Sequence, residues 1–246
     1  MKTAMVTGSA GVLGQATVRM LLEEGFRVVI HDSDERALAA LLNALGPLVN
    51  ENQCYPICFD ACNSDSVDKA MQRITNDFHP VYILVNNNGI LARTPVSQTS
   101  LQDWQHCFSQ NVDSAFLISR ALLPNMRKRK WGRIVNTCSI AGKTGGHTTG
   151  IAYSTTKGAL QTFTFALARE CAKDGITVNG IAPAYIRTPG VDAYPKEMVK
   201  MLLEYIPVGR FCEPEEFAHT IKFLISPLAG FICGEIIDQN GGLLMS

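Results

Sequence analysis

Short apolar runs alternate with longer amphipathic stretches along almost the whole of this chain. The apolar runs are rich in Val and Ile and lack strict alternation with polar residues, which is typical of strands buried on both faces. Helical patterns between successive strands predict right-handed crossovers and therefore a parallel sheet. The predicted strands are Thr3–Thr7, Arg27–His31, Cys54–Phe59, Val81–Val85, Arg133–Thr137, Ile176–Ile181 and Glu235–Asp238.

Helical patterns lie between these strands, for example at Gly14–Glu24, Asp34–Ala44, Ser64–Asp77 and Tyr153–Lys173. Neither a linker nor a low-complexity segment interrupts the alternation, so we expect a single domain over residues 1–246. The region 188–212 departs from the pattern, because Pro189, Gly190, Pro195 and Pro207 break it. A long irregular insertion in a compact domain predicts a lid over a substrate site.

The charge composition argues against several kinds of partner. Lys plus Arg and Asp plus Glu are both 22, so we expect neither nucleic acid nor an anionic membrane surface as a partner. The first predicted strand has no apolar signal segment before it, and no apolar run reaches the roughly 18 residues that a membrane helix needs. We therefore expect a cytoplasmic protein with reduced cysteines. The spacing of Cys54, Cys58 and Cys62 matches no usual zinc pattern, so no metal site is expected.

A glycine-rich loop, Thr7–Gly14, joins the first predicted strand to a helix. Glycines there allow a tight turn and the close approach of a pyrophosphate, and the helix N-terminus offers unpaired N–H groups. The place of the loop in the first β-α-β unit predicts a dinucleotide site. Asp32 follows the second predicted strand, at a place where a carboxylate binds ribose hydroxyls and repels a 2′-phosphate. NAD(H) is therefore favoured, and NADP(H) is the alternative if Arg36 binds that phosphate.

Polar residues that could carry chemistry gather at one predicted edge of the sheet. Tyr153 and Lys157 share one face of a predicted helix. A phenol releases its proton only well above neutral pH, so a neighbouring ammonium is needed to stabilise the phenolate. Ser139 and the run Asn86–Gly89 follow two strands at their carboxyl ends, where open α/β sheets bind ligands.

With these motifs in place, the chain resembles the short-chain dehydrogenase/reductase family over essentially its whole length. The motifs that carry the resemblance, in the family's order and spacing, are Thr7–Gly14, Asn86–Gly89, Asn111, Ser139, Tyr153–Lys157 and Ala182-Pro183. The resemblance implies an α/β fold, a single-domain Rossmann-type, doubly wound parallel sheet of seven strands with helices on both faces.

The resemblance also implies roles for four catalytic residues. Tyr153 is the acid/base, Lys157 favours its ionised form and binds the nicotinamide ribose, and Ser139 polarises the substrate oxygen. Asn111 bends its helix and holds a water that links Lys157 to solvent. The residues implied to contact the cofactor are Gly8, Gly11, Val12, Leu13, Gly14, Asp32, Asp60, Ala61, Asn87, Gly89, Tyr153, Lys157, Pro183, Ile186 and Thr188.

Several positions depart from the family pattern, although none removes a catalytic group. The family's usual glycine at Val12 stands one residue earlier, at Gly11, which predicts a slightly re-aimed phosphate loop. The segment from Ser139 to Tyr153 is one residue longer than is typical. The other departures are Tyr82, Asn88, Ala184 and Asn240.

The substrate is expected to lie against Arg93, Ser139, Ile140, His147 and Tyr185. The main hypothesis is hydride transfer between NAD(H) and a secondary alcohol or ketone, as in a sugar- or polyol-type dehydrogenase.

The first alternative is a 3-oxoacyl-[acyl-carrier-protein] or 3-oxoacyl-CoA reductase that uses NADPH. Here the basic run Arg127–Lys130, with Lys173, would bind an acidic acyl carrier protein. That run also suits a solvated helix end. The minor alternative is a non-catalytic dinucleotide sensor.

The resemblance further implies a homotetramer or homodimer. One interface would form on the helices that start near Leu101 and Tyr153, and a second on the apolar end Gly241–Met245.

Overall fold

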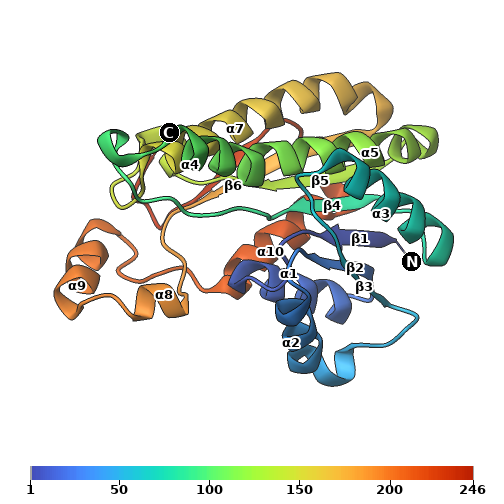
Figure 1. The fold of residues 1–246 in the computed structure, drawn as a ribbon, viewed down its shortest axis with the longest axis horizontal. Helices are drawn as coiled ribbons and strands as arrows, with labels where there is room; N and C mark the ends of the chain where they lie inside the picture. Colours follow the sequence, from blue (N-terminus) through green and yellow to red (C-terminus); the bar gives the residue numbers. More distant parts are fainter. Residues whose placement is uncertain (1, 246) are drawn as a thin grey trace.

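The computed structural model describes residues 2–245, which form seven strands and ten α-helices (Figure 1). The strands are β1 (Thr3–Val6), β2 (Arg27–Asp32), β3 (Cys54–Cys58), β4 (Ile83–Asn86), β5 (Gly132–Thr137), β6 (Ile176–Pro183) and β7 (Ile236–Gln239). The helices are α1 (Val12–Glu23), α2 (Glu35–Leu45), α3 (Ser64–Asp77), α4 (Leu101–Phe108), α5 (Ser114–Arg129), α6 (Ala141–Thr144), α7 (Ile151–Cys171), α8 (Pro189–Asp192), α9 (Lys196–Tyr205) and α10 (Pro214–Ile225).

The seven strands form one parallel sheet in the order β3-β2-β1-β4-β5-β6-β7. Helices α3, α4, α5 and α7 cover one face, and α1, α2 and α10 cover the other (Figure 1). The order reverses between β1 and β4, and open α/β sheets bind ligands outside the carboxyl ends of strands at such a switch point. The predicted seven-stranded, doubly wound sheet is confirmed.

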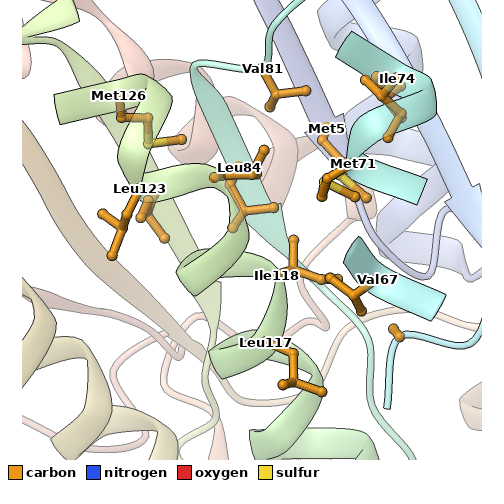
Figure 2. Packing of buried hydrophobic residues seen from close by; sticks show 14 of the residues in the cluster. Met5, Val67, Met71, Ile74, Val81, Leu84, Leu117, Ile118, Leu123 and Met126 are labelled. Carbon is orange, nitrogen blue, oxygen red and sulfur yellow. The ribbon is translucent and has the colours of Figure 1, made fainter. Parts of the chain in front are cut away.

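The strands are apolar on both faces because each face is covered by helices. Met5 packs with Leu84 beneath α3 and α5, in the cluster that Figure 2 shows. Its neighbours Ala4 and Val6 point to the opposite face, into a cluster that includes the fully buried Phe217 of α10. Burying a side chain of this kind stabilises the fold by about 1.5–3 kcal/mol.

Side-chain caps set where several helices begin. Asn63 accepts a hydrogen bond from the Ser66 amide, and α3 starts at Ser64 as predicted. Asp34 caps α2 by accepting from the amides of Arg36 and Ala37. A carboxylate or amide oxygen in this position stabilises a helix by about 1 kcal/mol.

The segment 188–212 leaves the sheet edge and carries the two short helices α8 and α9 (Figure 1). Two backbone hydrogen bonds hold the ends of the segment together. The Arg187 amide donates to the Cys212 carbonyl at 2.8 Å, and the Cys212 amide donates to the Tyr185 carbonyl at 3.0 Å. Leu202 and Phe211 give the segment a small core of its own. Within residues 2–245, no helix is long and apolar enough to cross a membrane.

Candidate active site

The glycine loop is shaped by close backbone contacts. Gly8 has a φ of 59°, and a Cβ there would lie 3.2 Å from the Asn87 carbonyl oxygen. A Cβ on Gly14 would lie 2.7 Å from Ser9 Cα, so α1 can lie against the loop only with glycine at this position. Gly11 differs, because its nearest neighbour would be the Gly8 oxygen at 3.5 Å. Gly11 therefore leaves room beside the N-terminus of α1.

Hydrogen bonds join the carboxyl ends of β1, β4 and β5. Thr7 Oγ1 accepts from the amides of Asn87 at 2.9 Å and Asn88 at 3.0 Å. Asn87 Nδ2 donates to the Gly8 carbonyl at 3.1 Å, and Thr137 Oγ1 donates to Asn87 Oδ1 at 3.3 Å. The side chain of Asn87 is thus held in one orientation at the strand switch point.

The Asp32 carboxylate is held at the end of β2 by two backbone amides. Oδ2 accepts from the Ala10 amide at 3.0 Å, and Oδ1 accepts from the Asp34 amide at 3.2 Å. Burial and the nearby carboxylates of Glu35, Asp32 and Asp34 raise the pKa of the Cys58 thiol. Three carboxylates therefore lie near this end of the site.

A cleft of about 530 Å³ runs along the carboxyl edge of the sheet from Asp32 to Lys157. Its glycine cradle, its amides and the carboxylate at its far end fit a dinucleotide. Of the residues expected to contact the cofactor, those that line the cleft are Gly8, Gly11, Val12, Leu13, Asp32, Asn87, Gly89, Tyr153, Lys157 and Thr188.

The other five expected cofactor residues lie outside the lining of this cleft. Gly14 packs behind the loop. Asp60 Oδ1 accepts from the Cys62 amide at 2.8 Å, beside the buried Ala61. Pro183 and Ile186 line the adjoining pocket.

Tyr153 and Lys157 lie one turn apart on α7, and the Lys157 Nζ is 5.6 Å from the centre of the Tyr153 ring. Lys157 is only 3% exposed. Its Nζ donates to the Thr137 carbonyl at 2.7 Å. A buried ammonium fixed in this way stabilises negative charge on a neighbouring phenol.

Asn111 lies in a π-turn, Ser109–Asp113, between α4 and α5. Its Oδ1 accepts from the Ile90 amide at 2.7 Å. Its Nδ2 donates to the Ile90 carbonyl at 3.1 Å and to Thr156 Oγ1 at 2.9 Å. Thr156 Oγ1 in turn donates to the Tyr153 carbonyl at 2.7 Å. Single π-turns are frequent at functional sites.

Sequence reasoning did not single out Thr156, which is fully buried. The available signal was its hydroxyl, one position before Lys157 on the helix that carries Tyr153.

Ser139 is 7% exposed and lies two residues after the end of β5. Its Oγ accepts from the Ala141 amide at 3.1 Å, and its carbonyl accepts from Gln161 Nε2 at 2.9 Å. A hydroxyl that accepts one bond still has a proton to donate. Ser139 can therefore polarise an oxygen placed beside Tyr153.

A second pocket, of about 450 Å³, adjoins the cleft beneath the segment 188–212. Tyr153 and Thr137 are among the residues that line both spaces, so the pocket and the cleft adjoin at Tyr153. The expected substrate residues Arg93, Ser139, Ile140, His147 and Tyr185 all line this pocket.

The basic run Arg127–Lys130 lies at the far end of α5. Arg127 and Lys130 both pair with Asp174, at 3.0 Å and 3.4 Å. Arg129 donates to the Tyr82 hydroxyl at 3.1 Å. Because α5 leads into the amino end of β5, the run lies at the edge of the sheet opposite the pocket within one chain.

Comparison with known proteins agrees with this geometry. The family model described as short chain dehydrogenase matches residues 2–198. The 3-oxoacyl-[acyl-carrier-protein] reductase FabG of Aquifex aeolicus (strain VF5) is 37% identical over 246 residues, which cover 98% of this chain and 97% of the relative.

Two solved structures share the fold. A short-chain dehydrogenase/reductase from Brucella melitensis, described as glucose/ribitol dehydrogenase, has a TM-score of 0.90 and 31% identity, covering 100% of this chain and 97% of that one. A 3-oxoacyl-[acyl-carrier protein] reductase from Brucella melitensis ATCC 23457 has a TM-score of 0.93 and 29% identity, covering 100% and 92%. The chain therefore belongs to the short-chain dehydrogenase family and is an NAD(P)-dependent oxidoreductase of alcohol and keto groups.

Proposed function

We propose that this enzyme reduces the keto group of 3-oxoacyl thioesters, carried on an acyl carrier protein or on coenzyme A, with NADH as the hydride donor. The observation that carries the proposal is the position of Tyr153 at the junction of cleft and pocket, with Ser139 and Lys157 beside it. Full-length similarity to 3-oxoacyl-[acyl-carrier-protein] reductases supports this substrate class over a simple secondary alcohol. All eight cysteines are unpaired thiols, which supports a cytoplasmic location.

The glycine loop and Asp32 would hold the dinucleotide in the cleft, where it would supply the hydride for the substrate carbonyl carbon. Ser139 Oγ donates a hydrogen bond to the carbonyl oxygen, and Tyr153 gives that oxygen its proton. Lys157, held by the Thr137 carbonyl, stabilises the phenolate that this step leaves. Asn111 keeps the π-turn against the loop that follows β4, which holds the relay in place.

Asp32 favours NADH in this proposal, whereas the resemblance to carrier-linked reductases implies NADPH. Its carboxylate is fixed by two amides and lies near Asp34 and Glu35. A 2′-phosphate placed there would meet negative charge at short range. Arg36 is exposed at the first turn of α2, and the Asp34 cap precedes it.

The test is a titration of the purified protein with NADH and NADPH, followed by turnover of acetoacetyl-CoA with each cofactor. We expect NADH to bind at least tenfold more tightly and to support reduction, with Tyr153→Phe losing turnover but not NADH binding. Tighter NADPH binding would overturn the assignment of Asp32. Binding without turnover of any 3-oxoacyl thioester would refute the substrate class.

A second candidate function is NAD-dependent oxidation of a sugar or other secondary alcohol. It is favoured by Asp32 together with the likeness to a protein described as glucose/ribitol dehydrogenase. Turnover of a polyol with NAD, in the absence of acetoacetyl-CoA reduction, would select it.

A further inference from the structure

The substrate pocket carries a positive charge. Arg93 lines it, and no Asp or Glu contributes to its lining within the part of the chain that the structure describes. A concave site with one sign of charge concentrates ligands of the opposite sign. This composition goes beyond what reduction of a neutral keto group requires.

The backbone of Arg93 is fixed relative to the reacting hydroxyl. The Gly150 amide donates to the Ala92 carbonyl at 2.8 Å. A Cβ on Gly150 would lie 2.7 Å from the Thr94 nitrogen and 2.8 Å from the Arg93 carbonyl carbon. The loop that carries Arg93 therefore lies directly on the start of α7, three residues before Tyr153.

The guanidinium of Arg93 reaches across the pocket to the segment 188–212. Its Nη2 donates to the Tyr194 hydroxyl at 2.9 Å, and Tyr194 lies between α8 and α9 and lines the same pocket. No carboxylate forms an ion pair with Arg93 among residues 2–245. A guanidinium has five N–H donors, so one phenol leaves most of them for a ligand.

Two other cations near this edge of the sheet are paired with carboxylates. Lys143 pairs with Asp238 at 2.6 Å, and Arg187 pairs with Glu213 at 2.9 Å. Arg93 differs from both because its guanidinium is bonded to the uncharged phenol of Tyr194.

We propose that Arg93 binds an anionic oxygen group of the substrate while the keto group lies at Tyr153. Tyr194 holds the guanidinium over the pocket, so the Arg93 guanidinium contacts both the segment 188–212 and the anion. The inference rests on the proposed function, in which the anion is the phosphate of a phosphopantetheine thioester. The carboxylate of a free 3-oxo acid offers the same chemistry, and the experiment separates the two sources. Both present two oxygens to a guanidinium in the geometry that arginine prefers.

Two matched substrate pairs test this and separate the sources. The phosphate pair is acetoacetyl-phosphopantetheine and acetoacetyl-pantetheine, and the carboxylate pair is acetoacetate and methyl acetoacetate. For wild type, Arg93→Gln and Tyr194→Phe, kcat/KM is measured for each member with saturating NADH. We expect Arg93→Gln to lower the ratio of anionic to neutral kcat/KM at least tenfold in one pair, mainly through KM, and Tyr194→Phe to lower it less.

Lys200→Gln is the matched control, because it removes one exposed positive charge from α9 outside the pocket lining. It should leave both ratios unchanged. An unchanged ratio in both pairs for Arg93→Gln would overturn the inference while leaving the thioester reductase intact.

If the proposed function is wrong, the result differs, because the wild-type protein then reduces neither thioester. Calorimetric binding of phosphopantetheine and of acetoacetate to the NADH-loaded protein then decides the inference. Binding that Arg93→Gln weakens at least tenfold supports it. Equal affinity in both proteins refutes it.

Discussion

Thr156 connects Asn111 to the backbone at Tyr153 through two hydrogen bonds inside a fully buried site. Thr156→Val keeps the shape but leaves one Asn111 N–H with only the Cys107 sulfur, a weak acceptor at 3.4 Å. A poorly satisfied buried donor costs about 1–3 kcal/mol. We expect the free energy of unfolding in urea to fall by that amount and kcat to fall at least several-fold, because the π-turn loses a contact with α7.

Thr156→Ser is the control, since it keeps the hydroxyl and removes one methyl group. Its unfolding free energy should fall by about 1 kcal/mol, the usual effect of a small deletion in a core, while kcat stays near wild type. Equal kcat in the Val and Ser variants would show that the hydroxyl does not position the relay.

At the scale of an element, the joint between the glycine loop and α1 gives a prediction that helix propensity alone would get wrong. Ala in place of a helical glycine is ordinarily stabilising by about 1 kcal/mol. In Gly14→Ala the new Cβ would meet Ser9 backbone atoms at 2.7 Å, which cannot move aside without displacing the loop. We therefore expect a lower melting temperature and loss of NADH binding.

Gly11→Ala is the matched variant, because its Cβ meets only the Gly8 oxygen at 3.5 Å and its φ of −70° suits any residue. Its melting temperature should match wild type, while NADH affinity in a fluorescence titration should fall. Unchanged affinity would place the pyrophosphate away from Gly11.

Elements whose ends depend on local chemistry could be predicted from the sequence. The bounds of α3 match because Asn63 is a cap. Strand ends depend on neighbouring strands, so β4 begins at Ile83, two residues after the predicted start. The π-turn depends on Asn111 meeting Ile90, a contact between distant parts of the chain.

In the site too, positions set by local sequence could be predicted, and positions set by contacts between distant segments could not. The order of motifs placed Tyr153, Lys157 and Ser139 at one edge of the sheet, where the structure brings them together. Whether Ile186 lines the cleft or the neighbouring pocket depends on which way the chain turns after β6. That turn is set by its bridge to Cys212, which local patterns do not reveal.

At the scale of the whole molecule, two apolar surfaces predict assembly. Exposed hydrophobic side chains on α4, α5 and α7 are Leu101, Phe116, Ile151 and Phe165, and those near the C-terminal end are Phe223, Leu228, Phe231 and Met245. Large exposed apolar patches mark interaction sites. We expect a tetramer in light scattering, with Phe165→Glu and Phe231→Glu each giving dimers and the double variant giving monomers. A monomeric wild type would contradict this.

The bond from the Ala10 amide to Asp32 Oδ2 limits how this enzyme can be re-engineered or can diverge toward another cofactor. A change that simply deletes the carboxylate also removes the acceptor that holds the glycine loop. One substitution therefore changes both the cofactor preference and the conformation of the loop. A successful exchange must keep a short acceptor at position 32, as Asp32→Ser or Asp32→Asn would, while a cation is added elsewhere. Cofactor choice in this molecule thus depends on both the glycine loop and the end of β2, and a change in one requires a matching change in the other.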